Sequence, residues 1–135
     1  MTDPLDRVRA EARTAMNQAY APYSGFKVGA ALLCGDLSVV AGCNVESASY
    51  PCGICAERAA LAAAVARGQR EFKAVVIVTD AIEPTPPCGM CRQALAEFSP
   101  GMTVVSRAAS GREAHWTLSD LLPSPFTPLS LPTQH

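Results

Sequence analysis

Two cysteine-bearing segments constrain the fold of this chain more than any other feature of its sequence. Cys55-Ala56-Glu57 and Pro87-Cys88-Gly89-Met90-Cys91 each lie where a loop pattern changes into a helix pattern. Free amides and the dipole at the start of a helix favour the thiolate, which is the form of cysteine that binds metal. Cys88 and Cys91 lie three positions apart on one helical turn and can therefore bind one ion, with Cys55 as a third ligand from the other helix.

The number of ligands decides what such a site does. Three ligands leave a fourth tetrahedral position open to water, as in catalytic zinc sites, whereas four close the site into a structural one. Glu57 could move a proton between that water and a substrate. Two alternatives remain open here. Cys52 could join the other three cysteines in a structural four-cysteine zinc module, which leaves Glu57 without a role, or it could form a redox dithiol with Cys55.

The rest of the pattern predicts one α/β domain over residues 1–135. Asp3-Pro4 and the apolar spacing after it predict a first helix that ends near Tyr20. We expect two more helices over 56–67 and 89–98, and strands over 28–33, 37–45, 74–78, 103–106 and 113–117, the first two joined by a tight turn at Gly35-Asp36. This order implies a sheet with helices on both faces. The proline-rich tail after residue 123 is expected to wrap around the domain, extended after about residue 126.

Composition narrows the function. Hydrophobic residues make up 49% of the 135 residues, which is apolar for so small a monomer and suggests that sister subunits cover part of the surface. The net charge is -1 and no two Lys or Arg residues are adjacent, so we expect no nucleic-acid partner. No apolar leader or membrane-spanning window is visible, which predicts a cytoplasmic protein. Six cysteines in that reducing compartment favour metal binding over disulfides.

The segments 55–60 and 87–93 resemble the two signature motifs of the small homotetrameric zinc-dependent cytidine deaminases. The segments 26–32, 42–46 and 121–126 match that family in order and spacing, and the likeness spans about residues 20–126. Two positions depart from it: Pro86 stands before the Pro-Cys motif where many relatives have Ser, and Cys52 is not a ligand in the family. The resemblance implies a three-layer α/β/α fold with a mixed five-stranded sheet.

The same resemblance implies a reaction and a metal site. The reaction is hydrolytic deamination of cytidine and 2′-deoxycytidine to uridine and 2′-deoxyuridine, as in pyrimidine salvage. One Zn²⁺ per subunit is held by Cys55, Cys88 and Cys91, and Glu57 shuttles protons. Arg58 could hydrogen-bond a ligand thiolate and so offset the charge of three thiolates, or it could form an ordinary surface ion pair.

The substrate contacts are likewise implied by the resemblance. Asn44 and Glu46 would hydrogen-bond the ribose 3′-hydroxyl, Phe26 would pack on the pyrimidine ring, and the backbone of Ala56 would meet the base edge. Without the resemblance, Phe26 is interpreted as ordinary core packing. For Asn44 and Glu46, the sequence alone favours a solvated strand end and a binding role about equally.

Two aromatic residues are implied to cross a subunit boundary. Tyr50 and Phe126 match family positions that reach the site of a neighbouring subunit, so we expect a homotetramer with shared active sites. Phe126 would otherwise be interpreted as core packing. A deaminase of a modified cytosine nucleoside, of the blasticidin S type, is the alternative within the superfamily. Asn44 and Glu46 favour an unmodified ribose over that alternative, and the neutral charge disfavours RNA or DNA editing.

Overall fold

A five-stranded sheet with helices on both faces forms the body of the molecule. The structure is a computed structural model that describes residues 3–132. In chain order its elements are α1 (Asp6–Met16), β1 (Val28–Cys34), β2 (Val39–Cys43), the 3-10 helix η1 (Tyr50–Cys52), α2 (Ala56–Ala66), β3 (Phe72–Thr79), α3 (Gly89–Ala96), β4 (Thr103–Arg107), β5 (Glu113–Thr117), α4 (Leu118–Leu121) and the 3-10 helix η2 (Pro128–Ser130). No helix of these residues is long and apolar enough to cross a membrane.

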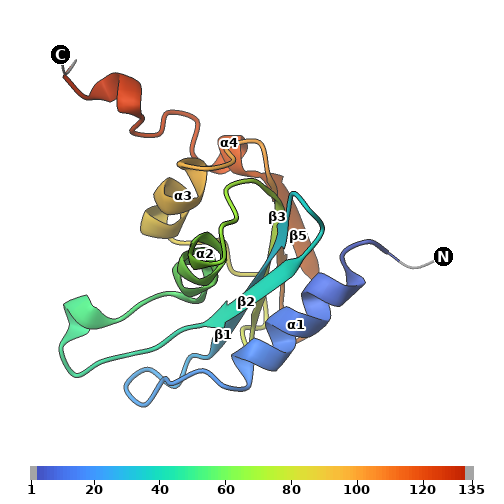
Figure 1. Ribbon diagram of the computed structural model, residues 1–135. Coiled ribbons are helices and arrows are strands. Elements are labelled where there is room, and N and C mark those ends of the chain that lie inside the picture. Colours follow the sequence, from blue (N-terminus) through green and yellow to red (C-terminus); the bar gives the residue numbers. More distant parts are fainter. Residues whose placement is uncertain (1–2, 133–135) are drawn as a thin grey trace.

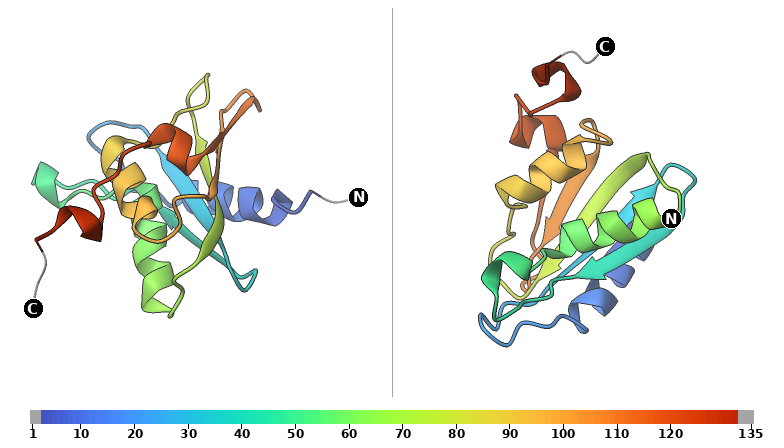
Figure 2. Two further views of the ribbon diagram at one scale, coloured as in Figure 1. Left: turned by 90° about the horizontal axis from the view of Figure 1, so that it is seen from above. Right: turned by 60° about the vertical axis from the view of Figure 1, so that its left-hand side comes forward.

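The sheet is mixed. Its strand order is β2-β1-β3-β4-β5, with β3 and β4 parallel and the other neighbours antiparallel. Helix α1 covers one face, and α2 and α3 cover the other (Figures 1 and 2). The expected three-layer α/β/α fold with a mixed five-stranded sheet is confirmed.

Alternate side chains of the central strands divide the core into two layers. On β1, Ala31 packs with the α1 residues Val8 and Ala12, whereas Ala30 and Leu32 pack with the α2 side. This is the period of two that a strand buried on both faces requires. The central strands therefore hold α2 and α3, the two helices with cysteines at their starts, on the same face.

Helix α2 lies unusually close to the sheet. A Cβ atom on Gly42 of β2 would stand 2.4 Å from the backbone nitrogen of Ala60, a distance that real Cβ atoms essentially never show. Only glycine permits this approach of helix and strand. The close contact fixes the height of α2 above the sheet, and with it the position of the residues at the start of the helix.

The boundaries differ from the predicted ones in the first half of the chain. Helix α1 ends at Met16, before Tyr20, because Tyr20 instead donates its N–H to the carbonyl of Asn44. Strand β2 begins at Val39 and not at Leu37, because Leu37 takes a φ of 72° in the turn after β1. It ends at Cys43 because Val45 leaves the sheet and pairs with Ile54.

The C-terminal tail is not irregular throughout. The sequence reasoning missed α4, which begins directly after β5, and the 3-10 turn η2 interrupts the stretch expected to be extended. The tail does not wrap around the domain as expected but leads away from the sheet past α3 (Figure 1). Gln93 of α3 holds it there, since the Gln93 side chain donates to the carbonyl of Phe126 at 2.7 Å and accepts from its N–H at 3.0 Å.

Candidate active site

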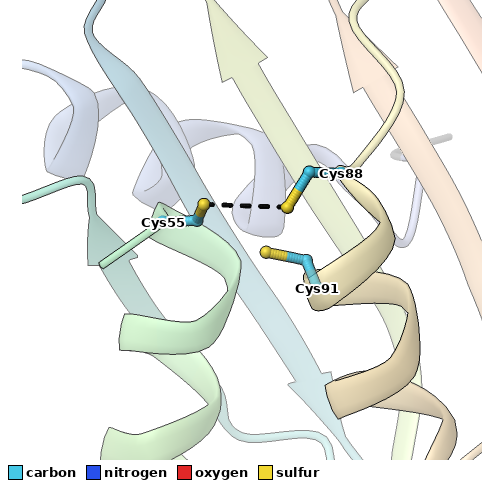
Figure 3. Close-up of side chains that lie close together, drawn as sticks. All are labelled: Cys55, Cys88 and Cys91. Atoms are coloured by element: carbon cyan, nitrogen blue, oxygen red, sulfur yellow. Dashed lines mark hydrogen bonds between the residues drawn. The ribbon is translucent and has the colours of Figure 1, made fainter. Parts of the chain in front are cut away.

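Three cysteine side chains converge between the starts of α2 and α3. Cys55 is the residue before α2, Cys88 is the residue before α3, and Cys91 lies in the first turn of α3. Their sulfur atoms all lie within 4.8 Å of one another, and the Sγ atoms of Cys55 and Cys88 are 3.8 Å apart (Figure 3). Cys52 is exposed on η1 and lies outside this cluster. The geometry therefore brings together the predicted three-ligand set and leaves out the fourth cysteine that a structural module needs.

The donor set fits Zn²⁺. Soft thiolates are preferred zinc ligands, and three of them leave one tetrahedral position open. The two helix starts direct their positive dipole ends at the sulfurs of Cys55 and Cys88. Cys55 and Cys88 also line a cavity of about 330 Å³, so an ion held by the three thiolates would lie beside a space where a small molecule can bind.

The electrostatics of the cluster favour a thiolate at Cys55. Hydrogen bonds from the thiol of Cys91, from Arg58 and from Cys88 lower the pKa of Cys55 to about 5. The hydrogen bond with Cys55 and burial raise the pKa of Cys91. A thiolate is the form of cysteine that binds a metal cation, so the lowered pKa of Cys55 suits a ligand.

Arg58 is directed at the cluster. Its Nη2 lies 3.8 Å from the Sγ of Cys55, and its Nε is buried with no hydrogen-bond partner. Arg58 is in none of the ion pairs found in the described part of the chain. The contact with Cys55 is the one expected of a side chain that tunes a metal site. The alternative role of Arg58, a surface ion pair, would need an acidic partner, and the ion pairs among the described residues include none for it.

Glu57 is a buried carboxylate in the first turn of α2. It is 5% exposed and lines the same cavity as Cys55 and Cys88. Burial, with a smaller contribution from the negative charge of Cys55, raises the pKa of Glu57. A carboxyl group whose pKa is raised in this way holds a proton more readily at neutral pH, as a general acid–base residue must.

The cavity brings together most of the predicted substrate residues. Phe26, Asn44, Glu46, Tyr50 and Ala56 all line it. Phe126 does not line it, and its side chain is 58% exposed on the tail. Sequence reasoning missed eight further lining residues, namely Val28, Val45, Gly53, Ile54, Ile77, Thr79, Thr85 and Pro86.

Some of the missed residues carried a signal in the sequence. Thr85 and Pro86 immediately precede the cysteine motif, and Ile77 and Thr79 end the buried strand β3. The carbonyl of Thr85 accepts a 2.7 Å hydrogen bond from Ser106 of β4, and that of Pro87 accepts one of 2.8 Å from Arg92. Both contacts hold the loop that contains the Pro86-Pro87 departure against the domain.

Asn44 and Glu46 are half-buried, and their side chains hydrogen-bond backbone groups of residues 23–28. The Asn44 side chain accepts the N–H of Val28 and donates to the carbonyl of Phe26, both at 2.8 Å. Glu46 accepts the N–H groups of Tyr23 at 2.9 Å and Ser24 at 3.1 Å. Each keeps hydrogen-bonding capacity for a ligand, since an amide nitrogen has two N–H donors and a carboxylate has about four acceptor sites. The pair can donate to and accept from one hydroxyl group.

Fold and site together define a class of protein: a hydrolytic enzyme of three-layer α/β/α fold, with three converging thiols that would hold zinc and a buried carboxylate beside them. Residues 3–107 match the family model described as the cytidine and deoxycytidylate deaminase zinc-binding region. The chain belongs to this family.

Individual relatives agree with the family match. The chain is 44% identical to the cytidine deaminase of Sporosarcina psychrophila over 124 residues, which cover 91% of each chain. It is 48% identical to that of Halalkalibacterium halodurans over 118 residues, or 87% of this chain and 89% of the relative. The crystal structure of the Burkholderia pseudomallei cytidine deaminase superposes with a TM-score of 0.87 at 45% identity, over 93% of this chain and all of the other. Blasticidin-S deaminase of Bacillus cereus is more distant, at 28% identity over 108 residues, or 74% of this chain and 76% of that one.

Proposed function

We propose that this chain is a zinc-dependent deaminase that hydrolyses free cytidine and 2′-deoxycytidine to uridine and 2′-deoxyuridine with release of ammonia. The observation that carries the proposal is the buried Glu57 beside three converging thiols, in a cavity of about 330 Å³. The identity of 44% and 48% to cytidine deaminases over most of the chain supports it. A reaction on free nucleosides serves pyrimidine salvage, and the free thiols of the described residues fit a reducing cytoplasm.

The residues divide between chemistry and binding. When bound by the three thiolates, Zn²⁺ supplies the Lewis acidity that makes water a nucleophile at neutral pH. Glu57 accepts a proton from the attacking water and delivers it to N3 of the ring, which makes C4 electrophilic. Glu57 then takes the remaining proton from the hydroxyl group added at C4 and delivers it to the leaving amine, so that the C4–N bond breaks, ammonia leaves and the added oxygen becomes the C4 carbonyl. Arg58 offsets part of the thiolate charge.

The residues that line the cavity orient the substrate. Phe26 packs on the pyrimidine ring, the backbone of Ala56 meets the base edge, and Asn44 with Glu46 binds the ribose 3′-hydroxyl. Because Asn44 can donate while Glu46 can only accept, the pair fits a hydroxyl group, which does both. This favours an unmodified ribose over the altered sugar of a blasticidin S type substrate.

Absorbance at the wavelengths where cytidine and uridine differ tests the proposal. We expect turnover of cytidine and of 2′-deoxycytidine, and much slower turnover of free cytosine, which offers no sugar hydroxyl to Asn44 and Glu46. Removal of zinc by a chelator should abolish activity, and readdition should restore it. Faster turnover of blasticidin S than of cytidine would favour the alternative substrate class, and no turnover of any cytosine compound would refute the proposal.

We further propose a homotetramer in which subunits share their active sites. Tyr50 on η1 is 78% exposed and Phe126 on the tail is 58% exposed. Both segments project from the body of the molecule (Figures 1 and 2). Other large apolar side chains are exposed as well: Tyr20, Tyr23, Leu37, Val45, Ile82, Met90, Leu129 and Leu131. Exposure of this kind marks surfaces that bind a partner, and closed symmetry lets each copy serve its neighbour.

Mixed oligomers test whether neighbouring subunits share their active sites. Tyr50 already lines the cavity of its own chain, so Phe126 is the cleaner residue to exchange. In a mixture of Glu57→Gln and Phe126→Ala subunits, some sites combine an intact Glu57 with a neighbour's intact Phe126. Co-refolded mixtures should therefore exceed the summed activity of the parent variants, while each variant refolded alone should not gain. An active monomer in sedimentation, or mixed oligomers without any gain, would contradict shared sites.

A further inference from the structure

The hydroxyl of Ser24 connects two walls of the active-site cavity. It donates a short hydrogen bond to the carboxylate of Glu46 and accepts the N–H of Phe26 at 3.0 Å. Glu46 and Phe26 both line the cavity, whereas Ser24 does not. Ser24 lies between the first predicted helix and the first predicted strand, and no motif in the sequence assigns it a role.

The turn that holds Ser24 is well defined. Gly25, the next residue, has a φ of 70°, a left-handed conformation that favours glycine, and its N–H donates to the carbonyl of Ala21 at 2.9 Å. This bend places the Oγ of Ser24 against the N–H of Phe26. The ring of Tyr23, on the other side of Ser24, lies edge-to-face with that of Tyr50 at 6.4 Å, so the turn also contacts the mouth of the cavity.

Glu46 is oriented by this turn alone among the described residues. One carboxylate oxygen accepts the N–H groups of Tyr23 and Ser24, and the other accepts the Ser24 hydroxyl. The Ser24 hydroxyl lowers the pKa of Glu46. The ionised carboxylate can only accept hydrogen bonds. The oxygen bonded to Ser24 has one donor and therefore retains capacity for a hydroxyl of the ligand.

We propose that Ser24 is a positioning residue for substrate recognition, whose hydroxyl orients Glu46 toward the sugar hydroxyl and Phe26 toward the base at the same time. The proposal rests on the proposed function, since it takes a nucleoside as the ligand. Ser24 acts through its two neighbours and touches neither Glu57 nor the three thiols in the hydrogen bonds of the structure.

This role predicts a particular kinetic signature. An interaction used equally in the ground state and the transition state changes KM and leaves kcat largely unchanged. Loss of a hydrogen bond to a charged group typically changes an equilibrium by about tenfold or more. Ser24→Ala should therefore raise KM for cytidine about tenfold and change kcat less than about threefold, and Ser24→Thr, which keeps the hydroxyl, should restore most of the loss.

A matched control lies on the opposite end of the sheet. Ser38 also donates its hydroxyl to a carboxylate in an exposed turn, to Asp36 at 2.6 Å, but neither residue lines the cavity. Ser38→Ala should leave KM and kcat unchanged. Each variant is compared with wild type for zinc content and melting temperature, so that a general loss of folding is separated from the effect on KM.

A change of substrate tests whether Ser24 acts through Glu46. Wild type should discriminate against 3′-deoxycytidine relative to cytidine, and Ser24→Ala should discriminate several-fold less, because Glu46 is no longer held in place. Unchanged discrimination, or a KM for cytidine within twofold of wild type, would overturn the proposal.

Amide exchange in the ligand-free protein provides a measurement that does not depend on activity. The N–H of Phe26 should exchange faster in Ser24→Ala than in wild type and Ser38→Ala, because its acceptor is gone. Equal exchange in all three would refute the positioning role. If wild type instead fails to turn over cytidine while Ser24→Ala still speeds exchange at Phe26, the error lies in the proposed substrate and not in the role of Ser24.

Discussion

An ion pair joins Arg9 of α1 to Glu113 of β5. Because of this ion pair, we expect the free energy of unfolding to depend on pH. Arg9 of α1 donates from Nε at 2.6 Å and from Nη2 at 2.9 Å to the two carboxylate oxygens of Glu113. Arg107 donates to the same carboxylate at 3.1 Å. The side chains of Arg9 and Glu113 are only 14% and 15% exposed. Chiefly through the hydrogen bond from Arg9, these contacts lower the pKa of Glu113 from an ordinary value of 4.5 to about 2.

Glu113→Gln removes the charge with little change of shape. A pKa difference of this size corresponds to about 3 kcal/mol. Arg107 is 37% exposed, so solvent screens its contribution to this energy. We therefore expect Glu113→Gln to lower the free energy of unfolding at pH 7 by about 2 kcal/mol. The lowered pKa means that the unfolded state binds the proton more tightly. The contribution is therefore fully present above pH 4.5 and is lost as the pH falls from there toward 2.

Urea denaturation of wild type and Glu113→Gln at several pH values measures this contribution. The difference in free energy of unfolding between the two proteins should be about three quarters of its pH 7 value at pH 4. It should be less than half of that value at about pH 3. Zinc release in acid affects both proteins alike and cancels in the difference. Glu83→Gln is the control, since Glu83 and its partner Arg112 are 64% and 66% exposed, and it should change stability by less than about 0.5 kcal/mol. The reasoning would be refuted if Glu83→Gln lost as much stability as Glu113→Gln. It would also be refuted if the difference in stability between wild type and Glu113→Gln stayed the same in acid.

Three further predictions concern the metal site and the helix that carries it. Metal analysis of Cys52→Ala should still find one zinc per chain. Alanine at any of the three converging cysteines should instead abolish or badly weaken zinc binding. Loss of zinc in Cys52→Ala would favour the structural four-cysteine zinc module. Arg58→Met should weaken zinc binding about tenfold in chelator competition, and an unchanged affinity would leave Arg58 without a role at the metal. Gly42→Ala should destabilise the fold by about 2 kcal/mol or more in urea, because the new Cβ would meet the backbone of Ala60 at 2.4 Å, while Gly101→Ala, with nothing within 4 Å, should not.

The sequence predicted most of the secondary structure because the strands are apolar runs of standard length and the helices have clear breakers. The errors lie where a particular contact, within a turn or between distant segments, overrides the local preference of a residue. Leu37 takes a left-handed conformation that no propensity favours, since the Asp36 carboxylate binds both the N–H and the hydroxyl of Ser38 and closes the turn. Tyr20 resembles the continuation of a helix but pairs with Val45, in the segment that follows β2.

The site was predictable to the extent that it is encoded in short motifs. The spacing of Cys88 and Cys91 on one helical turn, with Cys55 at another helix start, was sufficient to suggest the metal cluster. The contacts that orient the substrate residues were not predictable, because Ser24 and Glu46 lie on different loops and meet only in the folded chain. No periodicity or spacing signals such a contact between two loops.

Turnover and ligand binding by Glu57→Gln test the central claim most directly, namely that a buried carboxylate beside a three-thiolate zinc centre moves the protons of cytidine deamination. The substitution removes the ionisable group and keeps the shape and the zinc ligands. We expect the variant to retain one zinc per chain and to bind cytidine with an affinity near that of wild type, while kcat falls by about 10²–10⁴. A variant that binds zinc and cytidine and still deaminates at a rate near that of wild type would contradict the account.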